Sequence, residues 1–222
     1  MKFNILALTF SLIFSAHSMS PVQDRVAFDM RLAAQNLSKS LSAKQLKKLM
    51  HEKKKRWDYL PTFRLGIRRR KGITLKKLND EQIKKVWGLL ESGMSLMGME
   101  TIKFIRVLEA NHKKNPGFAR IAVKYDPMLY YISIYGDPNS PNWAWRFEGH
   151  HLSLNFTIKN GSVLSRSPTF MGALPNVIPK TKESGIHAGK RVLPNHIVPA
   201  LKLINDLSAK QRSKATLVVI SP

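Results

Sequence analysis

The order of side chains from Trp143 to Ile158, WAWRFEGHHLSLNFTI, constrains the fold more than any other stretch of the chain. Successive side chains of a β-strand point to opposite faces, so that every second residue shares a face. Bulky apolar residues take odd positions before Gly149 and even positions after it. One strand changes register in this way only through a slip, and a glycine is where a β-bulge absorbs the additional residue. The sequence therefore predicts a half-buried strand with a bulge at Gly149.

The polar residues of this stretch would then form one row on the opposite face of the strand. The row consists of Arg146, Glu148, His151, Ser153 and Asn155. A base, an acid, an imidazole, a hydroxyl and an amide side by side are more typical of a functional site than of an exposed strand face. β-Bulges also often lie next to active sites. We therefore favour a site on this strand, and a purely structural polar network is the alternative.

The candidate catalytic residues are Glu148, His151, Arg146 and Asn155. Glu148 and His151 can transfer protons near neutral pH when their surroundings tune the pKa. Arg146 would hold an anionic group of the substrate, and Asn155 would orient the substrate. Ser153 has no GxSxG context, which argues against serine hydrolysis. The chain also contains neither GxGxxG nor a Walker-type loop, which argues against a nucleotide cofactor.

Glu148 and His151 are also residue types that bind a divalent metal ion, and His150 is a third candidate ligand. The zinc signatures HExxH and HxH are absent from the sequence. Adjacent histidines on a strand point to opposite faces, so His150 is more often a hydrogen-bonded core residue than a ligand. Further ligands would have to come from elsewhere in the chain, and His187 and His196 are the candidates.

The chain is strongly basic, with a formal net charge of +23. Between residues 44 and 85, sixteen Lys and Arg residues stand against four Asp and Glu residues. Such a charge distribution attracts polyanions and anionic surfaces. The candidate residues for polyanion binding are Arg68, Arg69, Arg70 and Lys71. The alternative is a solvated face that only keeps the protein in solution.

Residues 1–18 have the pattern of a cleaved export signal. Lys2 supplies a positive charge, residues 3–14 are apolar, and residues 16–18 place small side chains where a signal peptidase cleaves. The apolar run is shorter than the ~20 residues that span a bilayer. We therefore expect an exported protein, periplasmic or secreted, whose residues 19–222 form a single domain. The chain contains no cysteine, so no disulfide can stabilise this domain.

The front of the chain has the helical period of about 3.6 residues, which changes to the strand period of two from residue 119. Helices are predicted from Pro21, over 80–94 and 100–112, and from Asn195 with Ile197, Leu201, Ile204 and Leu207 inward. Capping boxes are expected at Ser42, Asn79 and Ser208, and the sequence LSAKQ occurs twice, at 41–45 and 207–211. Strands are predicted at 121–123, 129–135, 150–158 and 216–220, with a hairpin turn at Asn160-Gly161. The expected fold is α+β, with helices packed on one face of a mostly antiparallel sheet.

The central motif resembles the W-x-W-R-x-E-G-H-H-x-S-x-N core of the bacterial and fungal family catalogued as domain of unknown function 3500. Other anchors of the resemblance follow in order at residues 57–61, 70–73, 136–138, 168–175 and 189–193. The resemblance extends from residue 20 to residue 215. Members of the family often look exported, which agrees with the expected signal. The family name carries no function.

Two differences from the family pattern affect what the resemblance implies. Members commonly carry an acidic residue after the G-x-R-x-L segment, where this chain has Pro194-Asn195-His196, and many extend further at the C-terminus. The resemblance therefore implies a shortened member with a more open site, or one that binds without catalysis. Our functional expectation is an enzyme, such as a metal-assisted hydrolase acting on a small or polymeric envelope substrate. The alternative is a polyanion- or envelope-binding protein that uses the basic region 44–85.

Overall fold

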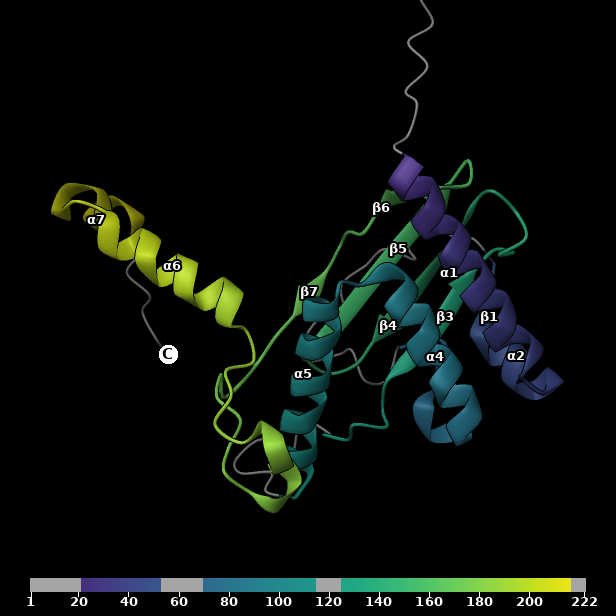
Figure 1. Cartoon of the computed structure of the whole chain (residues 1–222), viewed down its shortest axis with the longest axis horizontal. Coiled ribbons are helices and arrows are strands. Elements are labelled where there is room, and N and C mark those ends of the chain that lie inside the picture. Colours follow the sequence, from purple (N-terminus) through teal and green to yellow (C-terminus); the bar gives the residue numbers. More distant parts are fainter. Residues whose placement is uncertain (1–20, 53–69, 115–124, 217–222) are drawn as a thin grey trace, which may run out of the picture.

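The computed structural model describes residues 21–52, 70–114 and 125–216 and confirms the predicted α+β architecture (Figure 1). Helices pack against a mixed sheet in which most strand pairs are antiparallel. The predicted export signal, the strand at 121–123 and most of the last strand lie outside the described residues.

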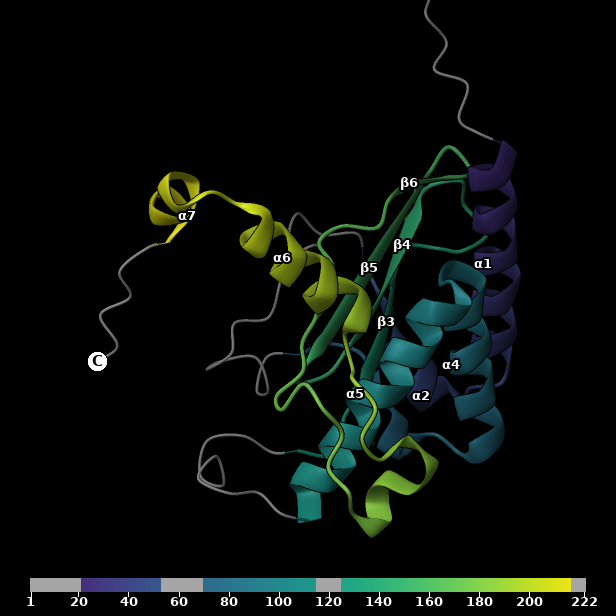
Figure 2. The same cartoon turned by 60° about the vertical axis from the view of Figure 1, so that its left-hand side comes forward.

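Four helices form the layer that packs on the sheet (Figures 1 and 2). They are α1 (Pro21–Lys39), α2 (Ala43–Leu49), α4 (Asp80–Gly93) and α5 (Leu96–Lys114). α1 packs along α4 and against the strand β6 (Ser162–Ser165), which ends the main order of the sheet, while α5 packs on α4. The predictions at 80–94 and 100–112 are confirmed, although α5 begins four residues earlier than the pattern indicated.

The sheet contains seven strands in the described part of the chain. They are β1 (Met50–His51), β2 (Ile73–Thr74), β3 (Tyr131–Tyr135), β4 (Trp143–Glu148), β5 (Leu152–Lys159), β6 (Ser162–Ser165) and β7 (Phe170–Met171). The main order is β1-β3-β4-β5-β6, with β2 beside β3 and β7 beside β5. Among the strands that the structure describes, only β1 and β3 pair in parallel. The predicted Asn160-Gly161 turn is confirmed, since it joins β5 to β6 with positive φ at both residues.

The central hairpin of β4 and β5 carries the apolar core of the sheet. Trp145 lies opposite Phe156 with the rings stacked and the centroids 4.2 Å apart, and Phe147 lies opposite Leu154. The indole Nε1 of Trp145 donates to the sulfur of Met30 in α1. All of these side chains are buried. The interpretation of the tryptophans as core residues is therefore confirmed.

The bulge predicted at Gly149 is wrong, because the chain reverses direction there. β4 and β5 are two antiparallel strands, and Gly149 to His151 form the turn between them. The Gly149 amide donates to the carbonyl oxygen of Leu152 at 2.8 Å. Because of the turn, the core-facing residues have odd numbers in β4 and even numbers in β5. A bulge in one continuous strand would have produced the same change in the sequence pattern. The predicted faces are therefore right for the residues of β4 and β5, although their cause is different, and wrong for His151, which lies in the turn.

The end of the described chain departs from the prediction of an inward-facing last helix. It forms α6 (Pro194–Asp206) and α7 (Ala209–Ala215), and neither helix has a buried residue. Leu201 and Ile204, predicted to face inward, are exposed. Both helices extend away from the body of the molecule, on the side opposite α1 (Figures 1 and 2). The helical pattern is thus confirmed, and the burial inferred from it is wrong.

All three predicted capping boxes are present, and one of them also connects two helices. Gln82 of α4 accepts a hydrogen bond from the Asn79 amide and donates to the Ser40 carbonyl and to Gln45 of α2. Its side chain is buried. The third box, formed by Ser208 and Gln211, has the same geometry on the exposed helix α7.

Replacing Gln82 with alanine should lower the free energy of unfolding by about 2–3 kcal/mol, because it removes several hydrogen bonds, among them the one to the part-buried carbonyl of Ser40. Urea denaturation followed by circular dichroism measures this loss. The matched control is Gln211→Ala, which breaks the same cap where no tertiary contact depends on it. It should change the global value by less than about 0.5 kcal/mol. Equal losses in the two variants would show that the cap alone matters, not the bridge between α4 and α2.

Candidate functional site

The predicted polar row lies on two adjacent strands. Arg146 of β4 faces Asn155 of β5, and Glu148 faces Ser153, all on the sheet surface opposite the aromatic core. These four residues are called the strand group below. Their side chains are buried, with 3% of Arg146 and 2% of Glu148 exposed. The structure therefore brings together three of the four predicted catalytic residues, Arg146, Glu148 and Asn155.

Asn155 orients Arg146. The Nε of Arg146 donates to Oδ1 of Asn155 at 2.5 Å. The Nδ2 of Asn155 donates to the Pro168 carbonyl and to the Ser153 hydroxyl. Both amide hydrogens of Asn155 thus have protein acceptors, and the Ser153 hydroxyl is enclosed. This geometry agrees with the argument against Ser153 as a nucleophile.

Glu148 is the acid of the strand group. Its Oε2 is buried and makes no hydrogen bond within the described part of the chain. Burial raises the pKa of this carboxyl, and the positive charges of Arg146 and Arg70 oppose the rise. A buried carboxyl with an acceptor oxygen left over is an uncommon arrangement in a folded protein.

His151 lies in the turn rather than on the strand face, and it belongs to a second set of residues. Its amide nitrogen donates to Oε1 of Glu109 at 3.3 Å, and its ring lies 4.2 Å from the ring of His150. Burial lowers the pKa of His151 to about 4, helped by the positive charge of His112. The imidazole is therefore neutral at neutral pH, and its Nδ1 makes no hydrogen bond in the described part.

Glu109 of α5 was not predicted and is the most deeply buried acid of the site, with 1% of the residue exposed. Burial raises its pKa to about 7, against the interaction with the Tyr130 hydroxyl and the hydrogen bond from the His151 amide. Burial raises the pKa of the Tyr130 hydroxyl well above its usual value, and the neighbouring Glu109 carboxyl acts in the same direction. Glu109, Tyr130, His150 and His151 are called the turn group below.

One sequence signal could have identified Glu109. It stands four residues after Ile105 and seven after Ile102, on the apolar stripe of the helix that those two residues define. A charged residue on such a stripe is buried with it, and lysine, arginine and acidic residues are almost never buried without a partner.

His150 is half-buried in the same turn, and the structure places it against aromatic rings. The Tyr125 ring meets it edge to face with the centroids 5.0 Å apart. Burial lowers the pKa of His150 to about 4, and the charges of neighbouring residues, His151 first, act in the same direction. The turn itself is packed tightly: a Cβ on Gly149 would overlap the Tyr130 ring. The Tyr130 ring thus restricts the turn that carries both histidines.

Arg70 acts on both groups. Its positive charge lowers the pKa values of Glu148, Glu109 and His150. Its side chain is half-buried, and its Nε is enclosed without a hydrogen bond in the described part. Arg70 is also one of the four residues predicted to bind polyanions. Of the other three, Lys71 is exposed, and Arg68 and Arg69 lie outside the described residues. Polyanion binding by these four residues stays a prediction.

The metal-site prediction for Glu148, His151 and His150 also stays a prediction. Within residues 21–52, 70–114 and 125–216, no three His, Asp or Glu side chains are grouped so that they could hold a metal ion. The additional candidates are separate from the turn, since His187 packs on the Phe104 ring and His196 is exposed on α6.

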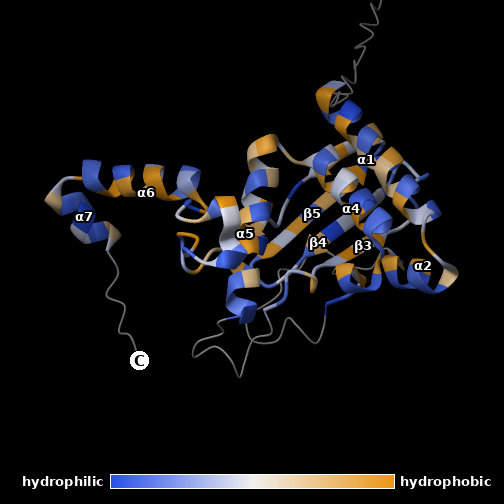
Figure 3. Cartoon of the chain, turned by 60° about the horizontal axis from the view of Figure 1, so that its bottom comes forward, coloured by the Kyte–Doolittle hydropathy of each residue, from blue (hydrophilic) through white to orange (hydrophobic). Residues whose placement is uncertain are grey.

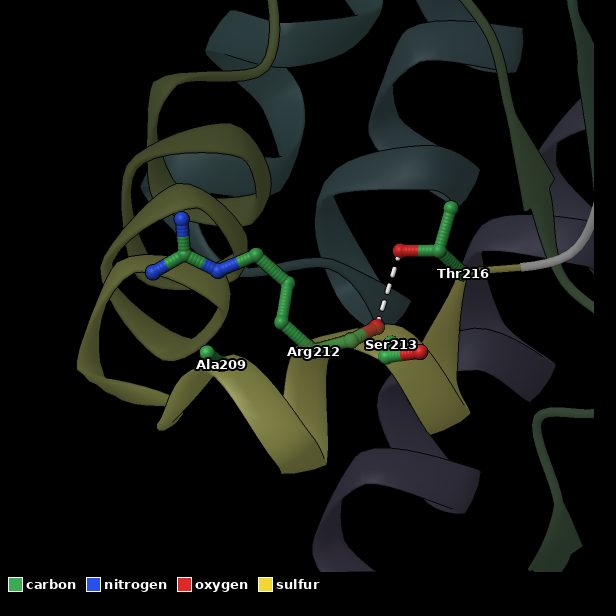
Figure 4. A pocket seen from close by; sticks show the side chains of 4 residues that line it. All are labelled: Ala209, Arg212, Ser213 and Thr216. Carbon is green, nitrogen blue, oxygen red and sulfur yellow. Dashed lines mark hydrogen bonds between the residues drawn. The ribbon is translucent and has the colours of Figure 1, made fainter.

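Two hollows on the described surface lie outside both groups. Figure 4 shows the first, which is lined by Ala209, Arg212, Ser213 and Thr216 at the exposed helix α7. The second lies between α1 and the loops at the far end of the hairpin, and Phe28, Arg31 and Trp143 are among its lining residues. Neither contains a residue of the strand group or the turn group.

The comparisons with known proteins identify a family without identifying an activity. In the described ranges, no helix combines the length and the apolar character needed to cross a bilayer. No curated protein and no solved structure matches the chain. The family described as "Protein of unknown function (DUF3500)" matches residues 23–221, which confirms the resemblance seen in the sequence. The chain therefore belongs to the DUF3500 family.

Proposed function

We propose that this protein is an enzyme in which Glu148 and His151 transfer protons, while Arg70 and Arg146 bind an anionic group of the substrate. The observation that carries the proposal is the burial of Glu148 Oε2 and His151 Nδ1, neither of which makes a hydrogen bond in the described part of the chain. Both atoms belong to groups that catalyse proton transfer in enzymes.

The energetic cost of these two atoms supports a functional interpretation. More than about 90% of buried polar groups in native proteins are hydrogen-bonded. Each one left unsatisfied destabilises the fold by about 1–3 kcal/mol. Residues that break this rule are expected at functional sites, where a ligand or a water molecule supplies the missing partner. A purely structural network, which is the alternative, would use these atoms within the fold.

The protonation states fit two different roles. The raised pKa of Glu148 keeps more of this carboxyl protonated, so it can donate a proton. The pKa of His151, lowered to about 4, leaves a neutral imidazole that can accept one. The two shifts have opposite directions, and each favours the uncharged form, which for the carboxyl is the proton donor and for the imidazole the proton acceptor. This pairing suits hydrolysis, in which water loses a proton and the leaving group gains one.

The strand group would supply the binding energy for an anionic substrate. The Nε of Arg146 is held by Asn155, which restricts the orientation of the guanidinium. A guanidinium binds carboxylate and phosphate groups through two parallel hydrogen bonds. Location outside the cytoplasm is part of the proposal and rests on the export signal expected at residues 1–18.

Glu148→Gln tests the proposal because it keeps the size of the side chain and removes its ability to transfer a proton. The protein is incubated with pools of anionic esters, amides and glycosides, and products are followed by mass spectrometry. Turnover of the converted compound should fall at least about 100-fold in the variant. The melting temperature should stay equal or rise, because no carboxylate has to be buried.

The matched control is Glu91→Gln, the same chemical change on the exposed side of α4. It should leave both turnover and melting temperature unchanged. A structural role for Glu148 predicts the opposite result, with a lower melting temperature in Glu148→Gln and full turnover of any compound that the native protein converts.

A further inference from the structure

A separate surface is formed by α6 and α7, residues Pro194–Ala215, which are called the C-terminal arm below. The arm leaves the body of the molecule on the side opposite α1, and neither of its helices has a buried residue (Figures 1 and 2). It includes none of the residues of the strand group or the turn group. Its role is therefore independent of the proposed catalysis.

α6 presents an exposed apolar face. Val198, Leu201 and Ile204 recur every third residue, so that they lie along one side of the helix. They are 58%, 58% and 43% exposed. The orange bands on α6 in Figure 3 show that apolar residues recur along this helix, which projects from the body. The polar residues Lys202 and Asp206 pair with each other at 2.6 Å, so the net charge of α6 itself is close to zero.

α7 adds positive charge next to this apolar face. It carries Lys210, Arg212 and Lys214 and no acidic residue, and all seven residues of the helix are exposed. The joint between the two helices is ordered, because Ser208 and Gln211 form a capping box and Arg212 donates to the Leu207 carbonyl. The cations are thus held at a defined end of the apolar face.

The chain contains a second helix pair with the same joint, and that pair is packed. The sequence LSAKQ joins α1 to the seven-residue helix α2, as it joins α6 to the seven-residue helix α7. α1 buries Ala27, Met30, Ala34 and Leu37 in the core. In the pair of α1 and α2, the apolar face of the long helix thus packs against the core. In the described part of the chain, no element packs in the same way on the apolar face of α6.

We propose that the C-terminal arm docks on a bilayer surface with anionic headgroups. α6 would lie in the interface with Val198, Leu201 and Ile204 toward the acyl chains, and α7 would place its three cations among the headgroups. An apolar helix face next to Lys and Arg residues is the pattern of interfacial membrane helices. Lys and Arg residues close to an anionic membrane surface add electrostatic attraction, which salt screens.

Charge and shape favour this occupant over two others. A second copy of the chain would bring another formal charge of +23 toward the arm. A nucleic acid would match the charge of α7, but its phosphates offer nothing to the apolar face of α6. An anionic bilayer matches both parts of the arm.

Vesicle flotation with the full chain tests the proposal. Phosphatidylcholine vesicles containing phosphatidylglycerol should bind the chain at least about tenfold more strongly than vesicles of phosphatidylcholine alone, and added salt should weaken the binding. Leu201→Glu should abolish it. Leu96→Glu, at an apolar residue of α5 that is 92% exposed and is not in the arm, is the control and should bind like the native chain.

The contribution of α7 is tested by the combined change Lys210→Gln, Arg212→Gln and Lys214→Gln. The matched control is Lys44→Gln, Lys47→Gln and Lys48→Gln, which removes the same charge from α2. Binding should fall at least tenfold more in the first variant. Equal losses, or equal binding to both kinds of vesicle, would overturn the proposal. So would a dimer in sedimentation velocity that Leu201→Glu converts to monomer, because the arm would then be covered by a second copy.

Discussion

Replacing Glu109 with glutamine should stabilise the protein at alkaline pH and leave its stability nearly unchanged at acidic pH. The carboxyl has a pKa of about 7 in the folded chain against 4.5 for an unperturbed glutamate. Below the lower value it is protonated in both states and contributes no difference. Between the two values only the folded state holds the proton, so the free energy of unfolding falls as the pH rises.

Above pH 7 the folded protein carries the full cost of the buried carboxylate. A shift of this size corresponds to about 3 kcal/mol. Glutamine removes that cost and keeps an oxygen that can accept the hydrogen bond from the His151 amide. For a chain of this length, the melting temperature should rise by about 6–12 °C at alkaline pH.

Differential scanning calorimetry over a pH series measures the effect. The exposed Glu91→Gln should show no difference from the native protein at any pH in the series. If Glu109→Gln instead melts lower at alkaline pH, the carboxylate is stabilised by Arg70 and Arg106, and burial is not the dominant cause of its pKa. A stabilised variant that loses turnover would place Glu109 among the residues that serve activity at the expense of stability.

Replacing Gly72 with alanine should lower the free energy of unfolding by at least about 3 kcal/mol. Gly72 has φ +104°, and a Cβ there would overlap the Ile132 carbonyl and the Ser133 hydroxyl of β3. The first contact is with backbone, so no side-chain rotation relieves it. Positive φ adds a further cost for any residue with a Cβ.

Gly161→Ala is the matched control for this prediction. Gly161 also has positive φ, at +78°, but apart from its two chain neighbours no atom of the described residues lies within 4 Å of the position of its missing Cβ. Its alanine variant should cost only about 1 kcal/mol, the price of the backbone conformation. Urea denaturation of both variants gives the comparison. Equal costs would mean that the backbone angle decides the effect and that β2 can move away from β3.

Gly72 also matters for the site. Its close approach to β3 places the segment from Arg70 to Thr74 beside that strand, where the Ser133 hydroxyl donates to the Lys71 carbonyl at 2.9 Å. Arg70 stands at the start of this segment, and its charge reaches Glu148, Glu109 and His150. Partial destabilisation at Gly72 should therefore disturb the site before the rest of the sheet.

The features that depend on neighbouring residues could be predicted from the sequence. Each capping box is decided within four residues, and Ser42, Asn79 and Ser208 all form one. The two faces of the central hairpin also follow from local alternation, which is why Trp145 and Arg146 were assigned to the correct sides. The local sequence does not show whether the apolar residues change from odd to even positions because of a bulge in one strand or because of a turn between two strands. Both produce the same pattern of apolar and polar residues.

The features that depend on distant packing could not be predicted. The apolar stripe of α6 has the same pattern as that of a buried helix, and burial depends on whether another part of the molecule covers it. Glu109 is buried because α5 packs against the turn of the hairpin, some forty residues later in the chain. The grouping of Glu148 with Arg70 has the same origin, since β2 and β4 both pair with β3.

The three residues Gly149, His150 and His151 set the orientation of everything that follows them in the hairpin. One residue more in this turn would shift β5 by one position and bring Leu154 opposite Arg146, and one residue fewer would bring Phe156 there. The polar and aromatic sides of the sheet would then be mixed along the whole strand. Evolution can therefore alter the chemistry of these positions by substitution, but it has almost no freedom to change their number.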